Sequence, residues 1–239
     1  MPEGWRGRRF TRFSVGLPIR HRVTGHPPAG VPVGWTVNLG GGGICVECAD
    51  RLLPQASLGL CLHTERGPMN AEARVVWHRD PLPTGGGNLH GLAFTDLRQE
   101  QLEILRSQLL SFRPWRHTRG RLPVDAAVTC QPRRPPGPLL WGRLSDLSRG
   151  GLLLHLPEVL PPFTDVEVTL PTPGGAVPLA GTIAWVESRE RRKPGRTIRH
   201  GVRFVALNWS TALALAHFLT ELPDGPQPPS SRVSTVHQP

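Results

Sequence analysis

The stretch Asp146-Leu147-Ser148-Arg149-Gly150-Gly151 has a counterpart 108 residues earlier in the chain, Asn38-Leu39-Gly40-Gly41-Gly42-Gly43. Both stretches are flanked by further matching segments, at separations of 108 to 110 residues. These segments are Arg12-Phe13-Ser14-Val15 with Arg121-Leu122-Pro123-Val124, Val75-Val76-Trp77 with Ile183-Ala184-Trp185, and Gly91-Leu92-Ala93-Phe94 with Gly201-Val202-Arg203-Phe204. Because this period is an ordinary domain size, the 239 residues are predicted to form two copies of one domain.

Each copy consists of short apolar segments separated by Gly- and Pro-containing turns, a pattern that predicts β-strands. The expected strands are 14–23, 33–37, 43–48, 57–64, 70–78 and 89–94 in the first copy, and 124–130, 139–144, 151–156, 165–170, 177–188 and 197–204 in the second. No helical pattern separates the strands within a copy, so we expect an antiparallel barrel or two-layer sheet rather than a parallel sheet.

An apolar segment with helical spacing ends each copy. In the first copy it contains Leu102, Leu105 and Leu109; in the second it runs over about 211–222, with Asn208 or Ser210 as the N-cap. The expected domains are therefore residues 1–112 and 113–222, of which 113–120 form a connector, followed by a Pro- and Ser-rich tail over 223–239 that we expect to be disordered.

The composition limits the class of protein. No apolar run approaches the roughly 18 residues of a membrane span, and residues 1–6 do not resemble a secretory signal, so we expect a cytoplasmic protein without a membrane span. The net charge is +10, and Lys193 is the only lysine. The arginines gather at matching places in the two copies: Arg6, Arg8, Arg9 and Arg12 in the first, and Arg113, Arg116, Arg119 and Arg121 in the second.

These arginine clusters precede the glycine-containing stretches by about 25 residues, and this combination resembles the PilZ family. That family uses the motifs R-x-x-x-R and D/N-x-S-x-x-G. The first copy holds the arginine motif as Arg8-Arg9-Phe10-Thr11-Arg12, and the second holds the turn motif as Asp146, Ser148 and Gly151. The resemblance extends over almost the whole chain as two copies.

The resemblance implies a mainly-β fold of two tandem six-stranded antiparallel barrels, each closed by a C-terminal α-helix. It also implies a non-enzymatic receptor that binds cyclic di-GMP, acts in bacterial second-messenger signalling and carries no cofactor. The ligand-binding residues that it implies are Arg8, Arg9, Arg12, Asn38 and Gly43 in the first copy, and Arg116, Arg119, Arg121, Asp146, Ser148 and Gly151 in the second. Arginine forks suit phosphate oxygens and guanine edges, while a carboxylate or amide oxygen accepts hydrogen bonds from guanine.

Neither copy matches the family pattern completely. Gly40 replaces the serine of the first turn and supplies no hydroxyl, and His117 stands where the first arginine of the second copy would align. The glycines of the turn motif, Gly43 and Gly151, are expected to permit positive φ and a close approach of ligand to backbone.

Other candidate sites have simpler explanations. Cys45 and Cys48 align with Leu153 and Leu156, so we interpret them as apolar core residues rather than zinc ligands. Trp77 and Trp185 are predicted to pack rather than to stack on a base, and His155 is predicted to be a surface histidine. No set of nucleophile, base and orienting residue is recognisable, so no catalytic activity is expected.

Three functions remain open at the level of sequence. The first is a cyclic di-GMP receptor in which ligand captures the connector arginines and changes the arrangement of the domains. The second is a degenerate adaptor that acts through a downstream protein partner without nucleotide. The third is a general nucleic-acid binder, which we rank last because no basic face with interleaved aromatic residues is visible.

Overall fold

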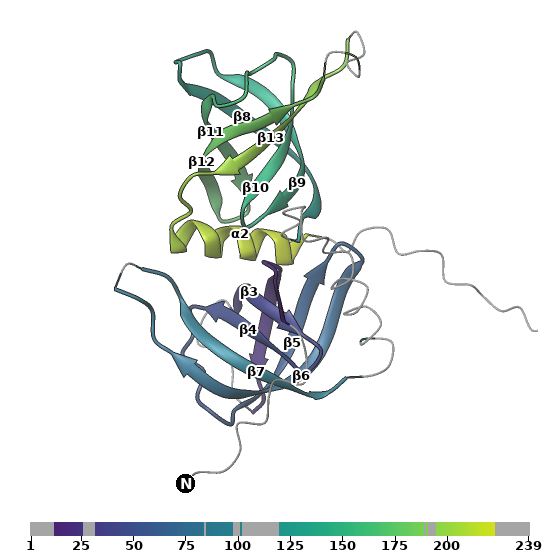
Figure 1. The fold of residues 1–239 in the computed structure, drawn as a ribbon, viewed down its shortest axis with the longest axis vertical. Helices are drawn as coiled ribbons and strands as arrows, with labels where there is room; N and C mark the ends of the chain where they lie inside the picture. Colours follow the sequence, from purple (N-terminus) through teal and green to yellow (C-terminus); the bar gives the residue numbers. More distant parts are fainter. Residues whose placement is uncertain are drawn as a thin grey trace, which may run out of the picture.

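The computed structural model describes residues 12–25, 32–83, 85–97, 101, 120–188, 190 and 195–222. Two groups of strands and one helix make up this part of the chain (Figure 1). Barrel 1 contains β1 (Arg12–Ser14), β2 (Pro18–Val23), β3 (Val33–Gly40), β4 (Gly43–Cys48), β5 (Ser57–Thr64), β6 (Gly67–Arg79) and β7 (Asn88–Asp96). Barrel 2 contains β8 (Leu122–Arg134), β9 (Leu140–Ser148), β10 (Gly151–Leu156), β11 (Asp165–Thr172), β12 (Gly175–Val186) and β13 (Ile198–Phe204), and it is followed by α2 (Trp209–Glu221).

Both groups of strands close into six-stranded antiparallel barrels, as the sequence predicts. Barrel 2 has the order β10-β13-β12-β11-β8-β9 and closes through the pairing of β9 with β10. Barrel 1 has the order β3-β2-β5-β6-β7-β4, closes through the pairing of β3 with β4, and adds the short strand β1 beside β3. Closure leaves few free strand edges, which explains how strands of this length avoid edge-to-edge association.

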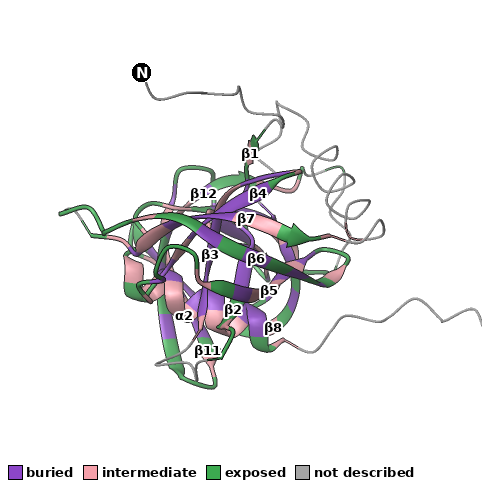
Figure 2. Cartoon of the chain, turned by 90° about the horizontal axis from the view of Figure 1, so that it is seen from below, coloured by how far each residue is buried: buried purple, intermediate pink, exposed green. Residues whose placement is uncertain are grey.

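Buried and exposed residues alternate along the long strands, as expected where one face of a strand packs in a core and the other meets solvent. Strand β6 shows this alternation over most of its length (Figure 2). The core of barrel 1 is built mainly from Leu, Val and Ile side chains, including Leu17, Ile19, Leu58 and Leu62. The core of barrel 2 has the same character and also takes in one face of α2.

The strand predicted over 14–23 is wrong in one respect, because the chain forms two strands separated by residues 15–17. The side chain of Thr36 explains the interruption. Its hydroxyl donates to the carbonyl of Val15 and accepts from the amide of Leu17 at 2.8 Å. The hydroxyl therefore replaces the backbone partners that these residues lack where the strand bends inward.

Helix α2 lies between the two barrels (Figure 1). Asn208 is its N-cap: the side-chain oxygen of Asn208 accepts from the amide of Thr211 at 2.8 Å. Its buried residues, including Leu215 and Leu219, close barrel 2, while its other side packs against β2 and β3 of barrel 1. The sequence predicts that this helix closes barrel 2, but it gives no indication that the helix also contacts barrel 1.

Several predicted features lie outside the described residues. They are the helix around Leu102 to Leu109, the domain boundary at 112/113, the connector up to residue 119 and the tail over 223–239. Among the residues that are described, no helix has the length and hydropathy that crossing a bilayer requires.

Candidate functional site

The turn motif of barrel 2 forms a tight hairpin between β9 and β10. Ser148 and Gly151 are the last paired residues of the two strands, and Arg149 with Gly150 makes the turn. The Ser148 hydroxyl donates to the carbonyl of Gly151 at 3.0 Å and accepts from the amide of Gly150 at 3.3 Å. The amide of Phe204 on β13 donates to the carbonyl of Gly150 at 3.1 Å. The serine therefore fixes the shape of the turn in the described structure.

An arginine and a carboxylate meet beside this hairpin. The Nη1 atom of Arg121 lies 3.0 Å from Oδ1 of Asp146, and the two side chains are 34% and 22% exposed. The alignment of β8 with β9, in which Pro123 pairs with Asp146, brings the segment that leads into β8 to this corner. The structure thus brings together one predicted residue from each of the two motifs.

Burial raises the pKa of the Asp146 carboxyl, although the Arg121 guanidinium beside it and, more weakly, His155 act to lower that pKa. His155 is half-buried on β10, and its Nε2 lies 3.1 Å from the hydroxyl of Ser145. The prediction of a plain surface histidine therefore missed its place next to the candidate site. The alternation of apolar and polar residues along β10 predicts that the His155 side chain points outward. It does not predict which residues of the neighbouring strand β9 lie next to that side chain.

The expectation that the motif glycines adopt positive φ is wrong, whereas a close approach of ligand to their backbone stays a prediction. Neither Gly43 nor Gly151 has positive φ, and both are the first residues of strands. A Cβ atom at Gly43 would collide with the carbonyl oxygen of Leu92, and one at Gly151 would collide with that of Val202. The glycines allow close contact with the backbone of the neighbouring strand, so their role here is packing within the barrel.

The corresponding corner of barrel 1 is arranged differently. Arg12 pairs with Gly40 across β1 and β3, so the position that carries a serine hydroxyl in barrel 2 has none here. The side-chain oxygen of Asn38 is buried and has no hydrogen-bond partner within the described part of the chain. Arg12 is exposed and acts with Arg79 to lower the pKa of the nearby Cys45 thiol, although burial dominates and raises that pKa overall.

Four predicted ligand-binding residues fall outside the described part of the chain. They are Arg8 and Arg9 before β1, and Arg116 and Arg119 before β8. Their participation in either site stays a prediction.

The hairpin of barrel 2 also contacts barrel 1. The Arg149 guanidinium forms an ion pair with the carboxylate of Glu47 on β4 and lies 6.0 Å from the centroid of the Trp35 ring. The other oxygen of Glu47 accepts from the amide of Gly87 at 2.9 Å. Arg149 occupies an unspecified position of the D-x-S-x-x-G motif, so the motif gives no signal of this contact.

The arrangement of two such motifs on two barrels agrees with a comparison of the chain with known domain families. The profile of the PilZ domain matches residues 7–111 and again residues 114–221. The chain belongs to the PilZ domain family. It is a tandem PilZ protein, as the sequence motifs predict.

Solved structures of other proteins resemble this tandem PilZ chain at low sequence identity. PlzA of Borreliella burgdorferi in complex with c-di-GMP is 12% identical, with 88% of this chain and 94% of that chain covered and a TM-score of 0.39. YcgR of Escherichia coli in complex with c-di-GMP is 15% identical, with 86% and 83% covered and a TM-score of 0.33. The Bacillus subtilis inhibitor of motility, MotI/DgrA, is 9% identical, with 87% and 96% covered and a TM-score of 0.36. A search of curated proteins finds no match.

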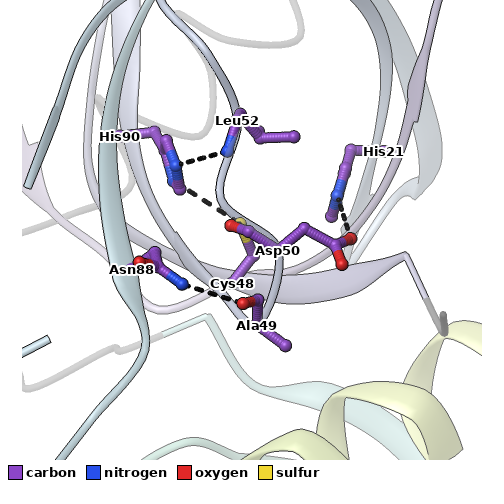
Figure 3. A network of polar contacts seen from close by, with 7 residues as sticks. All are labelled: His21, Cys48, Ala49, Asp50, Leu52, Asn88 and His90. Carbon is purple, nitrogen blue, oxygen red and sulfur yellow. Dashed lines mark hydrogen bonds and ion pairs between the residues drawn. The ribbon is translucent and has the colours of Figure 1, made fainter. Parts of the chain in front are cut away.

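A second polar cluster lies in the first PilZ domain, at the end of β4 (Figure 3). The Nε2 atom of His90 accepts from the amide of Leu52 at 3.0 Å, and Cys48 Sγ lies 3.5 Å from its Nδ1 atom. Burial is the main cause that lowers the pKa of His90 to about 4 and raises that of Cys48 to about 12. His200 makes the equivalent contact to the amide of Leu160 in the second domain. The repetition indicates that His90 holds the loop after β4 in place and that His200 does the same for the loop after β10.

Cys45, Cys48, Trp77 and Trp185 contribute to packing within the PilZ domains. Cys45 and Cys48 are buried, which confirms that they serve as apolar core residues. Within the described residues, no group of three or more potential ligands could hold a metal ion. The indole rings of Trp77 and Trp185 lie directly on the backbone of Gly91 and Gly201, in agreement with packing, and the two residues remain 38% and 42% exposed.

Proposed function

We propose that this chain is a non-enzymatic receptor for cyclic di-GMP and that the Asp146 corner of barrel 2 is its principal binding site. The observation that carries the proposal is the ion pair between Arg121 and Asp146 at 3.0 Å, beside a hairpin that Ser148 holds in shape. These three residues come from the two motifs of the PilZ family, and barrel 2 presents them on one corner.

The chemistry of this corner suits a dianionic guanine dinucleotide. A carboxylate such as Asp146 accepts hydrogen bonds from the N1–H and N2 amino groups of guanine. A guanidinium such as Arg121 forms paired hydrogen bonds with phosphate oxygens or with guanine O6 and N7. In the free protein these two groups neutralise each other. The ligand offers each of them a new partner, so one ion pair is exchanged for several charge-assisted hydrogen bonds.

The burial of Asp146 strengthens this reasoning. A half-buried carboxylate with a raised pKa is incompletely solvated, and additional donors stabilise its charged form. Guanine supplies such donors from a rigid edge. We infer that Asp146 gives the site its preference for guanine over other bases, and that Arg116 and Arg119 of the connector add phosphate contacts.

Barrel 1 supports a second, weaker site. The side-chain oxygen of Asn38, which has no partner among the described residues, is an acceptor that guanine N–H groups would satisfy, and Arg12 lies on the neighbouring strand β1. Arg8 and Arg9 belong to the same arginine motif. Because Gly40 provides no hydroxyl to fix the turn, we expect this site to bind less tightly than the corner of barrel 2.

Binding at barrel 2 also changes how the barrels contact each other. Arg149 follows Ser148 directly, so a shift of the hairpin moves the guanidinium that pairs with Glu47. Glu47 in turn holds the amide of Gly87, and the ring of Trp209 at the start of α2 lies against Gly87. This series of contacts joins the binding corner to the helix between the barrels.

Isothermal titration of cyclic di-GMP into the full chain tests the proposal. We expect saturable heat in the micromolar range, and a loss of affinity of about 10- to 100-fold in Asp146→Ala, because one charge-assisted hydrogen bond contributes about 1.5–3 kcal/mol. Asp125→Ala is the matched control: this carboxylate pairs with Arg143 on the exposed surface of the same barrel and is expected to leave the affinity unchanged.

An absence of binding by the folded wild-type chain would overturn the receptor proposal. The degenerate adaptor, whose activity in cells is insensitive to substitution of Arg12 and Arg121, would then replace it. The expectation that the chain has no specific nucleic-acid partner also stays a prediction. A steep dependence of DNA affinity on salt that ignores Ser148→Ala would contradict it.

A further inference from the structure

The outer face of β2 and β3 in barrel 1 is covered by α2. Trp35 is fully buried there, and its indole Nε1 donates to the carbonyl of Ala212 at 2.7 Å. Val33, two residues earlier on the same face of β3, is 2% exposed. Arg20 on β2 lies 3.6 Å from Glu221 near the end of the helix. This face therefore takes a helix, one of whose carbonyls accepts from a tryptophan and whose last turn offers a carboxylate to an arginine.

The internal repeat places an equivalent face on barrel 2, formed by β8 and β9 with the same strand register but different side chains. In barrel 1, Arg20 pairs with Val33 across β2 and β3. In barrel 2, Thr129 pairs with Trp141 across β8 and β9. Gly34 lies on the backbone of β4, and its counterpart Gly142 lies likewise on β10. We call the outward surface formed by Ala127, Thr129, Leu139, Trp141 and Arg143 the β8–β9 face.

Within the described structure nothing covers the β8–β9 face. Trp141 is 71% exposed and Leu139 is 53% exposed, although the residue that aligns with Trp141 in barrel 1 is Val33, which is buried. Arg143 pairs with Asp125, and both side chains are largely exposed. Helix α2 is already held between barrel 2 and the other face, so it cannot also cover this one.

We infer that the β8–β9 face binds an α-helix of a partner protein with the chemistry of α2. This helix presents Ala, Ser or Thr where its backbone approaches the Trp141 ring, leucines on either side, and a carboxylate that reaches Arg143. An exposed tryptophan that becomes enclosed is a typical centre of binding energy in protein interfaces. The indole N–H of Trp141, which stands at the register position of Val33 and not of Trp35, is a donor for a carbonyl or side-chain oxygen of that helix. The inference does not depend on nucleotide binding.

A helix-stapled, fluorescently labelled peptide with the sequence of residues 208–222 serves as the probe, because this helix covers the equivalent face of barrel 1. We expect the full chain to bind it, with Trp141→Ser and Leu139→Ser each weakening the affinity by about tenfold or more. Val205→Ser is the control, since Val205 is 69% exposed and lies after β13, away from β8 and β9. Circular dichroism confirms that each variant is folded.

Three results would overturn the inference. The first is the absence of peptide binding to the wild-type chain, and the second is equal binding by wild type and Trp141→Ser. The third is concentration-dependent dimerisation of the chain alone, measured by sedimentation, that Trp141→Ser abolishes. That result would show that the face binds a second copy of the chain instead of a partner's helix.

Discussion

Gly43 and Gly151 stand at positions where a single methyl group is too large for the barrel. Each begins a strand, and an added Cβ atom would meet the carbonyl oxygen of the neighbouring strand. The effect is steric and requires no special backbone angle. The same requirement in both barrels explains why the two motifs share this glycine although their other residues differ.

Gly151→Ala is therefore expected to lower the free energy of unfolding by about 1–3 kcal/mol, the usual cost of overpacking a tightly packed region. Chemical denaturation measures the change. Gly174→Ala is the control, because a Cβ atom at Gly174 meets only the Thr172 hydroxyl at 3.9 Å. Equal stability of the two variants would contradict the steric explanation.

His90 makes the stability of barrel 1 depend on pH. Its neutral ring accepts from the amide of Leu52, and burial lowers its pKa from 6.5 to about 4. The folded protein thus binds fewer protons than the unfolded chain between these pH values. The stabilisation is complete above about pH 6.5 and is lost as pH falls towards about 4, up to about 3 kcal/mol in total.

Urea denaturation at about pH 7.5 and about pH 5 checks this prediction. We expect His90→Gln to lower the stability at the higher pH and to reduce the difference between the two pH values. His155→Gln, on the other barrel, is expected to keep the full difference. A wild-type protein whose stability is unchanged between these pH values would show that His90 is not held neutral by its surroundings.

At the scale of elements, β1 and β2 show how one side chain replaces part of a strand. The Thr36 hydroxyl joins Val15 and Leu17 where the pairing of the two strands with β3 is interrupted. In barrel 2 the aligned residue is Leu144, and the single strand β8 instead has an irregular register between Pro123 and Ala126. The two copies thus reach the same bend by different means.

Thr36→Val removes the hydroxyl while keeping the shape of the side chain. We expect a loss of about 1–3 kcal/mol in stability, because two buried backbone groups lose their partner. Thermal unfolding measures it. Thr182→Val serves for comparison, since the Thr182 hydroxyl donates to Asp165 at a half-buried position and leaves no backbone group unpaired. An equal and small effect of both changes would indicate that water satisfies Val15 and Leu17.

Sequence patterns predict the elements well where the reason for a residue is local. The repeat, the strand alternation, the Asn208 cap and the packing of Trp77 and Trp185 all depend on neighbours in the chain or on the adjacent strand. The bend at Thr36 is missed because a threonine within a strand has an ordinary interpretation. The sequence motifs predict that an arginine and a carboxylate belong to one site in barrel 2. They do not predict that His155 lies beside Asp146, because this depends on which strands are neighbours in the barrel.

At the scale of the whole molecule, the contact between the barrels lies beyond what a repeat can predict. A repeat describes what the copies share, while Trp35, Glu47 and Arg149 join one copy to the other and have no equivalents in these roles. Trp35 aligns with Arg143, which is exposed. The contact between copies therefore arises at positions where they differ.

Glu47 is expected to oppose ligand binding at barrel 2, because its carboxylate holds Arg149 in the free protein. Glu47→Gln removes the charge and retains an acceptor for the amide of Gly87. We expect this variant to bind cyclic di-GMP several-fold more tightly, since less energy is needed to release the hairpin. Titration measures the affinity, with Glu72→Gln on the exposed surface of β6 as the control. An unchanged affinity would show that ligand binding does not require Arg149 to leave Glu47.

Hydrogen exchange of the backbone amides, with and without cyclic di-GMP, tests the central claim most directly. Ligand at the Asp146 corner is predicted to slow exchange over residues 148–151 and to change exchange at Gly87, whose amide donates to the same Glu47 carboxylate that Arg149 contacts. The account would be contradicted if saturating ligand left the exchange of both regions unchanged, or if protection appeared only in barrel 1.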